Sequence, residues 1–248
     1  MKHKPLSRIP RFEVMLLKRG LALALMCSVF VAVPAVISES PAGALSCGTS
    51  ESWFAGTSPT PQTNYYATTQ LTTQPVLSLC TTETDSWSLA WVMIADNAGD
   101  GWTQSGYVWR PAYSTSYLFA QYSKNGSSWY TAFYNSAPST AQYYVEYDFT
   151  NADMFMVAHA VTLLTTPWDP DTEWTTPWLP EWEGEVNYSN NDVPGSQSAT
   201  ANFSSMGIKT SRGGSVVNPS GLSLDMSTSN FGAAWDTSQS AFHIWSKS

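Results

Sequence analysis

Large apolar residues recur at every second position through most of this 248-residue chain. In residues 142–149 (QYYVEYDF), Tyr143, Val145, Tyr147 and Phe149 fall on one face of an extended backbone. Such alternation of aromatic and β-branched residues is typical of half-buried strands. The same pattern fills further segments, namely residues 87–94, 102–110, 116–123, 128–135, 184–189, 198–208 and 241–245.

Turn residues separate these segments. Lys124-Asn125-Gly126-Ser127 is a strong hairpin signal, because Asn-Gly accepts the positive φ angles of a tight turn. Asp100-Gly101 and Pro194-Gly195 mark further turns. Residues 154–164 (MFMVAHAVTLL) are also compatible with a helix, but their Val and Thr content favours a buried strand.

The spacing of these elements predicts the fold class. Many short strands without an amphipathic helix indicate an all-β protein, an antiparallel β-sandwich of the concanavalin-like or jelly-roll type. Residues 45–248 are enough for a single domain of this kind.

The first 44 residues have the composition of a signal peptide. A basic leader precedes an apolar run at residues 21–37, and Ala42-Gly43-Ala44 supplies the small residues of a cleavage site. The alternative is an uncleaved single-span anchor, because the run is near the lower limit for crossing a bilayer. We expect cleavage before Leu45 and a secreted, extracellular protein.

The expected mature chain is strongly acidic. Residues 45–248 contain five basic and seventeen acidic residues, a formal charge of −12. Nucleic acid and anionic membrane surfaces are therefore poor partners, because both would be repelled. Acidic medium would protonate the carboxylates and relieve the repulsion.

Two cysteines remain after the leader, Cys47 and Cys80, and one disulfide between them is the simplest expectation for an exported chain. His159 and His243 are not at the spacing of metal ligands, so we predict no zinc site and no cofactor. Calcium remains an alternative at three acids of one loop: Asp169, Asp171 and Glu173.

That loop belongs to the most unusual stretch of the chain, residues 165–186 (TTPWDPDTEWTTPWLPEWEGEV). The motif TTPW occurs twice, and the prolines predict a stiff, extended crossover loop that leads into a strand near Gly184. Its tryptophans have two interpretations. Exposed rings at Trp168, Trp174 and Trp178 could contact a ligand such as a sugar, or the rings belong to the core.

Two segments carry a candidate catalytic pair. Residues 90–109 form two expected strands, and the second contains Gln104-Ser105-Gly106-Tyr107. Residues 182–186 read Trp-Glu-Gly-Glu-Val. This arrangement resembles that of the eqolisin glutamic peptidases, in which a Trp-Val-Gly-Ile-Asp-Gly strand leads to Gln-x-Gly and a later Trp-x-x-Glu supplies the acid. It is also similar, more distantly, to the neprosin-type glutamic peptidases, whose acid lies in Trp-Gly-Gly-Glu-Val.

The resemblance implies an antiparallel sandwich with Gln104 and Glu185 as the catalytic residues. This chain departs from the eqolisin strand at Met93, which replaces a glycine, and at Ala95, which stands where an aspartate is expected.

The pair is chemically reasonable for peptide hydrolysis. Glu185 lies close to Trp182 without a nearby cation, so desolvation should raise its pKa and let it exchange a proton with water in acidic medium. The amide of Gln104 would bind the oxyanion, an interaction worth roughly 3 kcal/mol. Gly106 would let the substrate backbone approach closely. The expected substrate contacts are five aromatic residues: Trp91, Trp102, Tyr107, Trp178 and Trp182.

The same residues also have an ordinary interpretation. A glutamine and a glutamate on the strands of a sandwich commonly face solvent, and a slip of one residue in register exchanges the two faces of a strand. Glu183 could therefore take the position assigned to Glu185.

Three functions follow from these patterns. The first is a secreted acid endopeptidase that acts on polypeptides through Gln104 and Glu185. The second is a non-catalytic, lectin-like sandwich that binds glycans through the loop tryptophans. The third is a non-catalytic protein of the cell surface or matrix.

Overall fold

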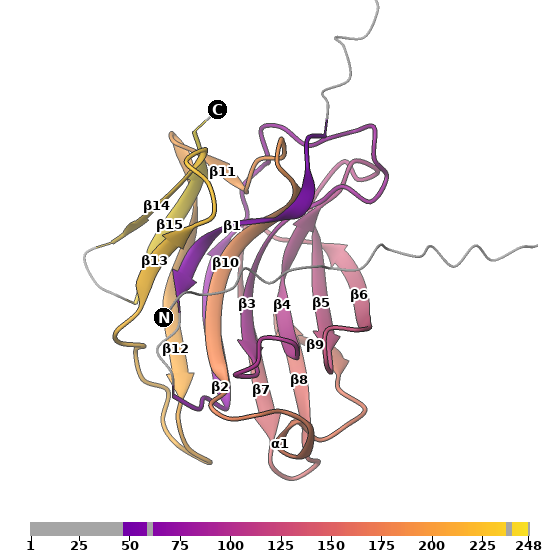
Figure 1. The fold of residues 1–248 in the computed structure, drawn as a ribbon. Helices are drawn as coiled ribbons and strands as arrows, with labels where there is room; N and C mark the ends of the chain where they lie inside the picture. The colour runs from indigo at the N-terminus through magenta and orange to yellow at the C-terminus, as the bar shows by residue number, and fades with distance from the viewer. Residues whose placement is uncertain (1–46, 59–61, 237–239, 248) are drawn as a thin grey trace, which may run out of the picture.

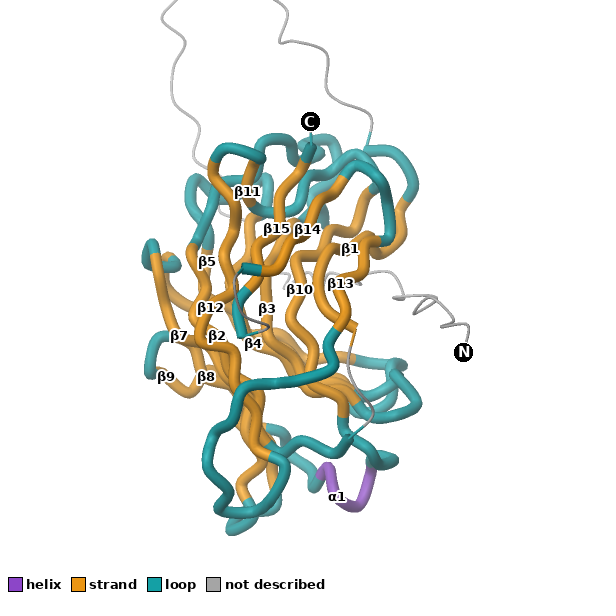
Figure 2. The backbone as a smooth tube through the Cα atoms, turned by 90° about the vertical axis from the view of Figure 1, so that its left-hand side faces the viewer, coloured by secondary structure: helices purple, strands orange, loops and turns teal. Residues whose placement is uncertain are grey.

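The computed structural model describes residues 47–58, 62–236 and 240–247, so the expected signal peptide lies outside the described residues. Two β-sheets stack face to face, as Figures 1 and 2 show from two directions. The seven-stranded sheet has the order β13 (Ser223–Met226), β1 (Ser50–Ser58), β10 (Leu179–Tyr188), β3 (Ser88–Ala95), β4 (Trp102–Trp109), β5 (Tyr117–Ser123) and β6 (Trp129–Ser136). The eight-stranded sheet has the order β14 (Phe231–Trp235), β15 (Phe242–Ser246), β11 (Gly195–Ser196), β12 (Ala199–Lys209), β2 (Tyr66–Thr72), β7 (Thr140–Asp148), β8 (Asp153–Ala158) and β9 (Val161–Thr165).

The predicted β-sandwich is confirmed. Neighbouring strands pair antiparallel throughout the described residues, except that β11 and β15 pair in parallel at Ser196 and Ser246. The core lies between the sheets, where alternate residues of each strand meet. Its largest fully buried side chains include Trp178, Trp182, Tyr107, Tyr143 and Phe203.

Two hairpins show how local sequence sets the turns. Gly126, in the Asn-Gly turn between β5 and β6, has a φ of 72°, as the turn signal predicted. Residues 154–164 are strand rather than helix, but they form two strands, β8 and β9. His159 and Ala160 make the tight turn between them, with φ values of 50° and 63°.

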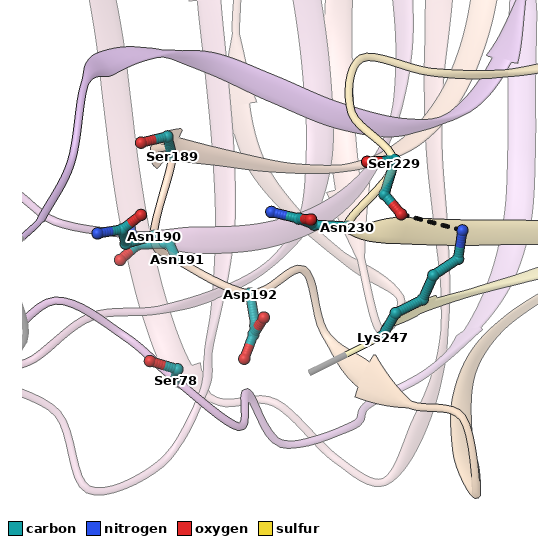
Figure 3. Close-up of a pocket in the computed structure, with 8 residues that line it drawn as sticks. All are labelled: Ser78, Ser189, Asn190, Asn191, Asp192, Ser229, Asn230 and Lys247. Carbon is teal, nitrogen blue, oxygen red and sulfur yellow. Dashed lines mark hydrogen bonds between the residues drawn. The ribbon is translucent and has the colours of Figure 1, made fainter.

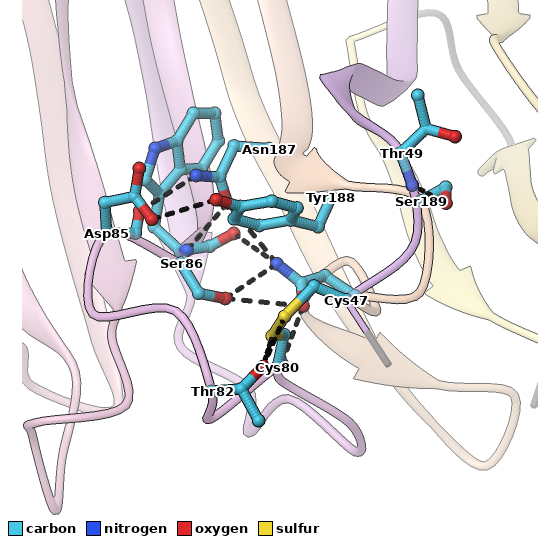
Figure 4. The surroundings of a disulfide bond; sticks show 11 residues. Cys47, Thr49, Cys80, Thr82, Asp85, Ser86, Asn187, Tyr188 and Ser189 are labelled. Atoms are coloured by element: carbon cyan, nitrogen blue, oxygen red, sulfur yellow. Dashed lines mark hydrogen bonds between the residues drawn. A yellow bond between two sulfur atoms is a disulfide. The ribbon is translucent and has the colours of Figure 1, made fainter. Parts of the chain in front are cut away.

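The expected disulfide between Cys47 and Cys80 is present, with a Cα–Cα distance of 5.1 Å. It links the residues before β1 to the loop between β2 and β3, as Figure 4 shows. Tyr188 packs against both cysteines, and Cys47 Sγ lies 2.8 Å from Thr82 Oγ1. The bond therefore fastens the start of β1 to one end of the sandwich.

Within residues 47–58, 62–236 and 240–247, no helix is long and apolar enough to cross a membrane.

Candidate active site

Strand β10 separates two kinds of side chain by its alternation. Trp182, Gly184 and Val186 point into the core, and the indole nitrogen of Trp182 donates a 3.0 Å hydrogen bond to the carbonyl of Thr68 on the opposite sheet. The intervening residues, Glu181, Glu183 and Glu185, therefore lie on the other face of the seven-stranded sheet. We call this face, turned away from the eight-stranded sheet, the outer face.

Glu185 is held by two donors on the outer face. Its Oε1 accepts a hydrogen bond from the Ser52 hydroxyl on β1, and its Oε2 accepts one from Trp91 Nε1 on β3 at 3.1 Å. Burial raises the pKa of Glu185 above its ordinary value, while the hydrogen bonds from Ser52 and Trp91 oppose the rise. The carboxyl group is thus fixed in orientation and able to exchange a proton.

Two further glutamates share this environment, and the sequence analysis did not assign them to the site. Burial, followed by the charge of Glu185, raises the pKa of Glu181 to about 8. Burial also raises the pKa of Glu183 well above its usual range, together with the charges of Glu181, Glu185 and Asp225. Alternation along residues 179–188 was the available signal, because it places all three carboxyl groups on one face.

No ion pair neutralises these three glutamates in the part of the chain that the structure describes. The ion pairs found there join other residues: Lys124 to Glu173, Lys209 to Glu146, and His243 to Asp236.

Gln104 lies on the same outer face, on β4. It pairs with Met93 of β3, which in turn pairs with Glu181 of β10. The side chain is only 5% exposed, and its Nε2 donates a 2.7 Å hydrogen bond to Gln121 Oε1 on β5. The glutamate in the same cross-strand row as Gln104 is therefore Glu181.

Gln104 and Glu185 share a face but are not in contact. Glu185 pairs with Leu89 and Gln104 pairs with Met93, four residues further along β3. Two strand spacings and four residues of rise separate their Cα atoms by about 16 Å.

The five aromatic residues expected to bind substrate divide between the two faces. Trp91 and Trp102 lie on the outer face, where the neighbouring Leu89, Met93 and Phe119 form an apolar surface.

For the other three residues the expectation differs from the structure. Tyr107, Trp178 and Trp182 are fully buried between the sheets, so none of them presents a ring to the outer face. For Tyr107 the reason is register: it alternates with Gln104, and its hydroxyl donates a 3.3 Å bond to the carbonyl of Thr72.

The tryptophans of the Pro-rich loop pack on one another. Ring centroids are 5.3 Å apart for Trp168 and Trp174, 5.8 Å for Trp174 and Trp178, and 5.3 Å for Trp178 and Tyr147. Trp174 and Trp178 are buried, and Trp168 is half-buried. The loop thus closes the end of the core, and two of its three candidate ligand rings are not available.

This loop is also less extended than its prolines predicted. It contains the short helix α1 (Pro170–Glu173), and β10 begins at Leu179, five residues before Gly184. Pro180 is tolerated in β10 because the pairing with β1 reaches only to Glu183, so no partner strand lies beside it on that edge.

Structural roles account for two of the three acids considered for calcium. Asp169 caps α1 by accepting from the Asp171 nitrogen and also accepts from the Tyr147 hydroxyl at 2.8 Å. Glu173 pairs with Lys124 at 2.9 Å. Among the described residues, no group of three or more His, Cys, Asp or Glu side chains could hold a metal ion.

Gly106 has a different role from the one expected. A Cβ atom there would lie 2.0 Å from the carbonyl oxygen of Ala90 and 2.8 Å from the Cα of Trp91. The space beside Gly106 is therefore occupied by β3, not left open for a substrate backbone.

A second, polar hollow lies at the end of the sandwich near the disulfide (Figure 3). Its volume is about 390 Å³, and Lys247 Nζ donates to the carbonyl of Ser229 beside it at 3.1 Å. The lining residues are Ser78, Ser189, Asn190, Asn191, Asp192, Ser229, Asn230 and Lys247.

The architecture has counterparts among solved structures. Scytalido-glutamic peptidase, in complex with a peptide-based transition-state analogue, aligns with a TM-score of 0.55 and 10% identity, covering 80% of this chain and 100% of that chain. SCP-B, a member of the eqolisin family of peptidases in complex with the tripeptide Ala-Ile-His, aligns with a TM-score of 0.55 and 9% identity, with the same coverage. The fold resembles that of the glutamic peptidases.

This likeness is one of fold. No protein-family model matches the sequence, and no curated protein matches it either. At 10% identity the roles of individual residues have to be argued from their own contacts on the outer face.

Proposed function

We propose that this protein is a secreted, acid endopeptidase-like hydrolase that cleaves peptide bonds with Glu185 and Gln104 on the outer face. The observation that carries the proposal is the hydrogen bond from Trp91 to Glu185, on the face that also presents Gln104. It joins the aromatic strand and the acid of the two motifs that resemble the eqolisins, in a chain whose fold resembles theirs.

The reaction uses Glu185 first as a base and then as an acid. Ionised Glu185 accepts a proton from water while the water oxygen attacks the peptide carbonyl carbon. The oxyanion that forms accepts a hydrogen bond from the amide of Gln104. Protonated Glu185 then gives its proton to the peptide nitrogen, the C–N bond breaks, and an acid and an amine leave.

The separation of the two residues sets a condition for this mechanism. A water molecule and a carbonyl group, hydrogen-bonded at each end, bridge roughly 7–8 Å. Gln104 and Glu185 must therefore lean toward each other over Met93 and Trp91, with the scissile bond between them. Gln104 would exchange its bond to Gln121 for one to substrate only in part, since its amide has two N–H groups.

Acidic medium suits this arrangement. The three carboxyl groups of β10 have raised pKa values and no cationic partner among the described ion pairs, so at neutral pH their charges would repel one another. At low pH most of them are neutral, and the apolar surface around Trp91 and Met93 can receive an uncharged, extended polypeptide.

The test is hydrolysis of denatured protein substrates by the purified protein between pH 2 and 5. We expect activity that is insensitive to chelators and to serine- or cysteine-directed reagents. Glu185→Gln should abolish it, and Gln104→Met should lower kcat by about 10²–10³-fold. Glu173→Gln, which alters a glutamate in the loop that closes the core, should have no effect. Intact substrates across this pH range, or full activity in Glu185→Gln, would refute the proposal.

Export is a separate part of the proposal, because residues 1–44 lie outside the described residues. N-terminal sequencing of the protein from the medium of its host should read from Leu45. A protein that remains with the cells and keeps its leader would contradict it.

A further inference from the structure

A chain of side-chain hydrogen bonds crosses three strands of the outer face. Gln104 Nε2 donates to Gln121 Oε1 at 2.7 Å, and Gln121 Nε2 donates to Thr131 Oγ1 at 2.7 Å. The three residues lie in one row, because Gln104 pairs with Gln121 and Gln121 with Thr131. The row continues on the other side of Gln104 to Met93 and Glu181.

This chain leaves Gln104 with a defined set of free groups. A glutamine amide has two N–H donors and one carbonyl oxygen, and one N–H is taken by Gln121. The second N–H and the carbonyl oxygen are left. These are the two groups that peptide hydrolysis by activated water requires: a donor for the oxyanion and an acceptor that orients the attacking water.

The bond to Gln121 also sets which way the amide faces. If the amide turned over, the carbonyl oxygen of Gln104 would meet the carbonyl oxygen of Gln121, and two acceptors repel. Gln121 is in turn held by Thr131, whose hydroxyl accepts from its Nε2. The orientation of Gln104 is therefore determined two strands away, on β6.

We infer that Gln121 is a positioning residue for the proposed reaction: it locks the Gln104 amide so that one N–H and the carbonyl oxygen face the substrate. The inference rests on the proposed function of Gln104. Thr131 supports Gln121 in the same way from the edge strand.

An ordinary polar ladder on a sheet surface would have no such consequence. The backbone pairing of β4 with β5 and of β5 with β6 continues over many residues without these side chains. Removing the side-chain bonds should therefore leave the fold intact, and a selective loss of catalytic rate distinguishes the two cases.

The test compares three variants on the outer face with one matched control. Gln121→Met keeps the length of the side chain and removes the acceptor, whereas Gln121→Glu keeps an acceptor for Gln104 Nε2. Thr131→Val removes the far hydroxyl. Gln142→Met is the control, because Gln142 on β7 makes a similar bond to the Thr68 hydroxyl at 3.3 Å on the other sheet.

We expect Gln121→Met to lower kcat by about tenfold with KM changed less than twofold, because oxyanion binding acts in the transition state. Gln121→Glu should keep most of the wild-type kcat, Thr131→Val should fall between the two, and Gln142→Met should match wild type. The side-chain amide signals of Gln104 in the NMR spectrum, assigned with Gln104→Met, should collapse toward solvent-exposed shifts in Gln121→Met alone.

The outcomes separate this inference from the proposed function. An active wild type with an unchanged kcat in Gln121→Met, or unchanged Gln104 amide signals, would overturn the inference and leave the peptidase proposal standing. A wild type without peptidase activity would overturn both.

Discussion

The indole nitrogen of Trp91 lies 3.1 Å from Glu185 Oε2 and donates a hydrogen bond to it between neighbouring strands of one sheet. This contact links the aromatic strand β3 to the glutamate-bearing strand β10. It decides that Glu185 has its carboxylate fixed toward β3, whereas Glu183 lies over β1, where its Cγ would be 2.3 Å from a Cβ at Gly56. Neighbouring glutamates of one strand are thus turned to different partners.

Trp91→Phe should change the acidity of Glu185. The lost donor favours the ionised form, so its removal raises the pKa of Glu185 further. The acidic limb of the pH profile of kcat/KM should therefore move to higher pH. Trp102→Phe is the control, because Trp102 is on the same face and is not among the groups that bond to Glu185. An acidic limb that stays in place in Trp91→Phe would argue against this role of Trp91.

Folding stability should fall as pH rises from acid to neutral. The pKa values of Glu181, Glu183 and Glu185 are raised in the folded protein, so the folded state holds these protons more tightly than the unfolded chain. Stability is then greatest below the unfolded value of 4.5 and declines until about pH 8 for Glu181.

The expected decline is on the order of 3 kcal/mol between pH 4 and pH 8, because each unit of pKa shift corresponds to about 1.4 kcal/mol. Urea unfolding at a series of pH values measures it. Glu183→Gln removes one of the three buried charges and should flatten the curve. A midpoint as high at pH 8 as at pH 4 in the wild type would show that the glutamates are solvated.

Gly184→Ala should destabilise the fold from the core side of β10. An added Cβ would lie 2.1 Å from Ile244 Cδ1 on the opposite sheet and 3.5 Å from Val193 Cβ. Overpacking of this kind typically destabilises a core by about 1–3 kcal/mol. The urea midpoint measures the loss, and Gly213→Ala is no neutral control because Gly213 has a φ of 66°. Thr172→Ala, at an exposed position of the loop, is the better reference, and equal midpoints for the two variants would contradict the prediction.

The disulfide should contribute about 3–4 kcal/mol, the amount expected in the chain-entropy model for a loop of its length. Cys47 and Cys80 are separated by 33 residues, and both are buried against Tyr188. The double variant Cys47→Ser/Cys80→Ser should unfold at lower urea concentration than wild type and should not respond to a reductant. A wild-type midpoint that is unaffected by reduction would exclude a stabilising role for the bond.

Much of the fold could be predicted from alternation. The predicted segments 87–94, 102–110, 116–123 and 128–135 correspond to β3, β4, β5 and β6 within one or two residues. The hairpin at Asn125-Gly126 was readable because its turn requires a positive φ. Short strands such as β11 and β13 gave no signal, because two to four residues are too few to show a period of two.

Within the candidate site, the sequence determined which residues of a strand share a face. Period two places Glu181, Glu183 and Glu185 together and Trp182 opposite them, whatever the rest of the chain does. It did not determine which of these faces turns toward the core or which carboxyl group meets Trp91, because both depend on the register between strands far apart in sequence.

The tertiary structure alone decided the fate of the loop tryptophans. Their exposure depends on Tyr147 of β7 and on the β5–β6 turn, where the carbonyl of Lys124 accepts the indole N–H of Trp174 at 3.1 Å. Local sequence predicts the direction of a side chain through backbone geometry, but burial requires a partner surface. That surface comes from segments 20 to 50 residues away, and only the folded chain brings them together.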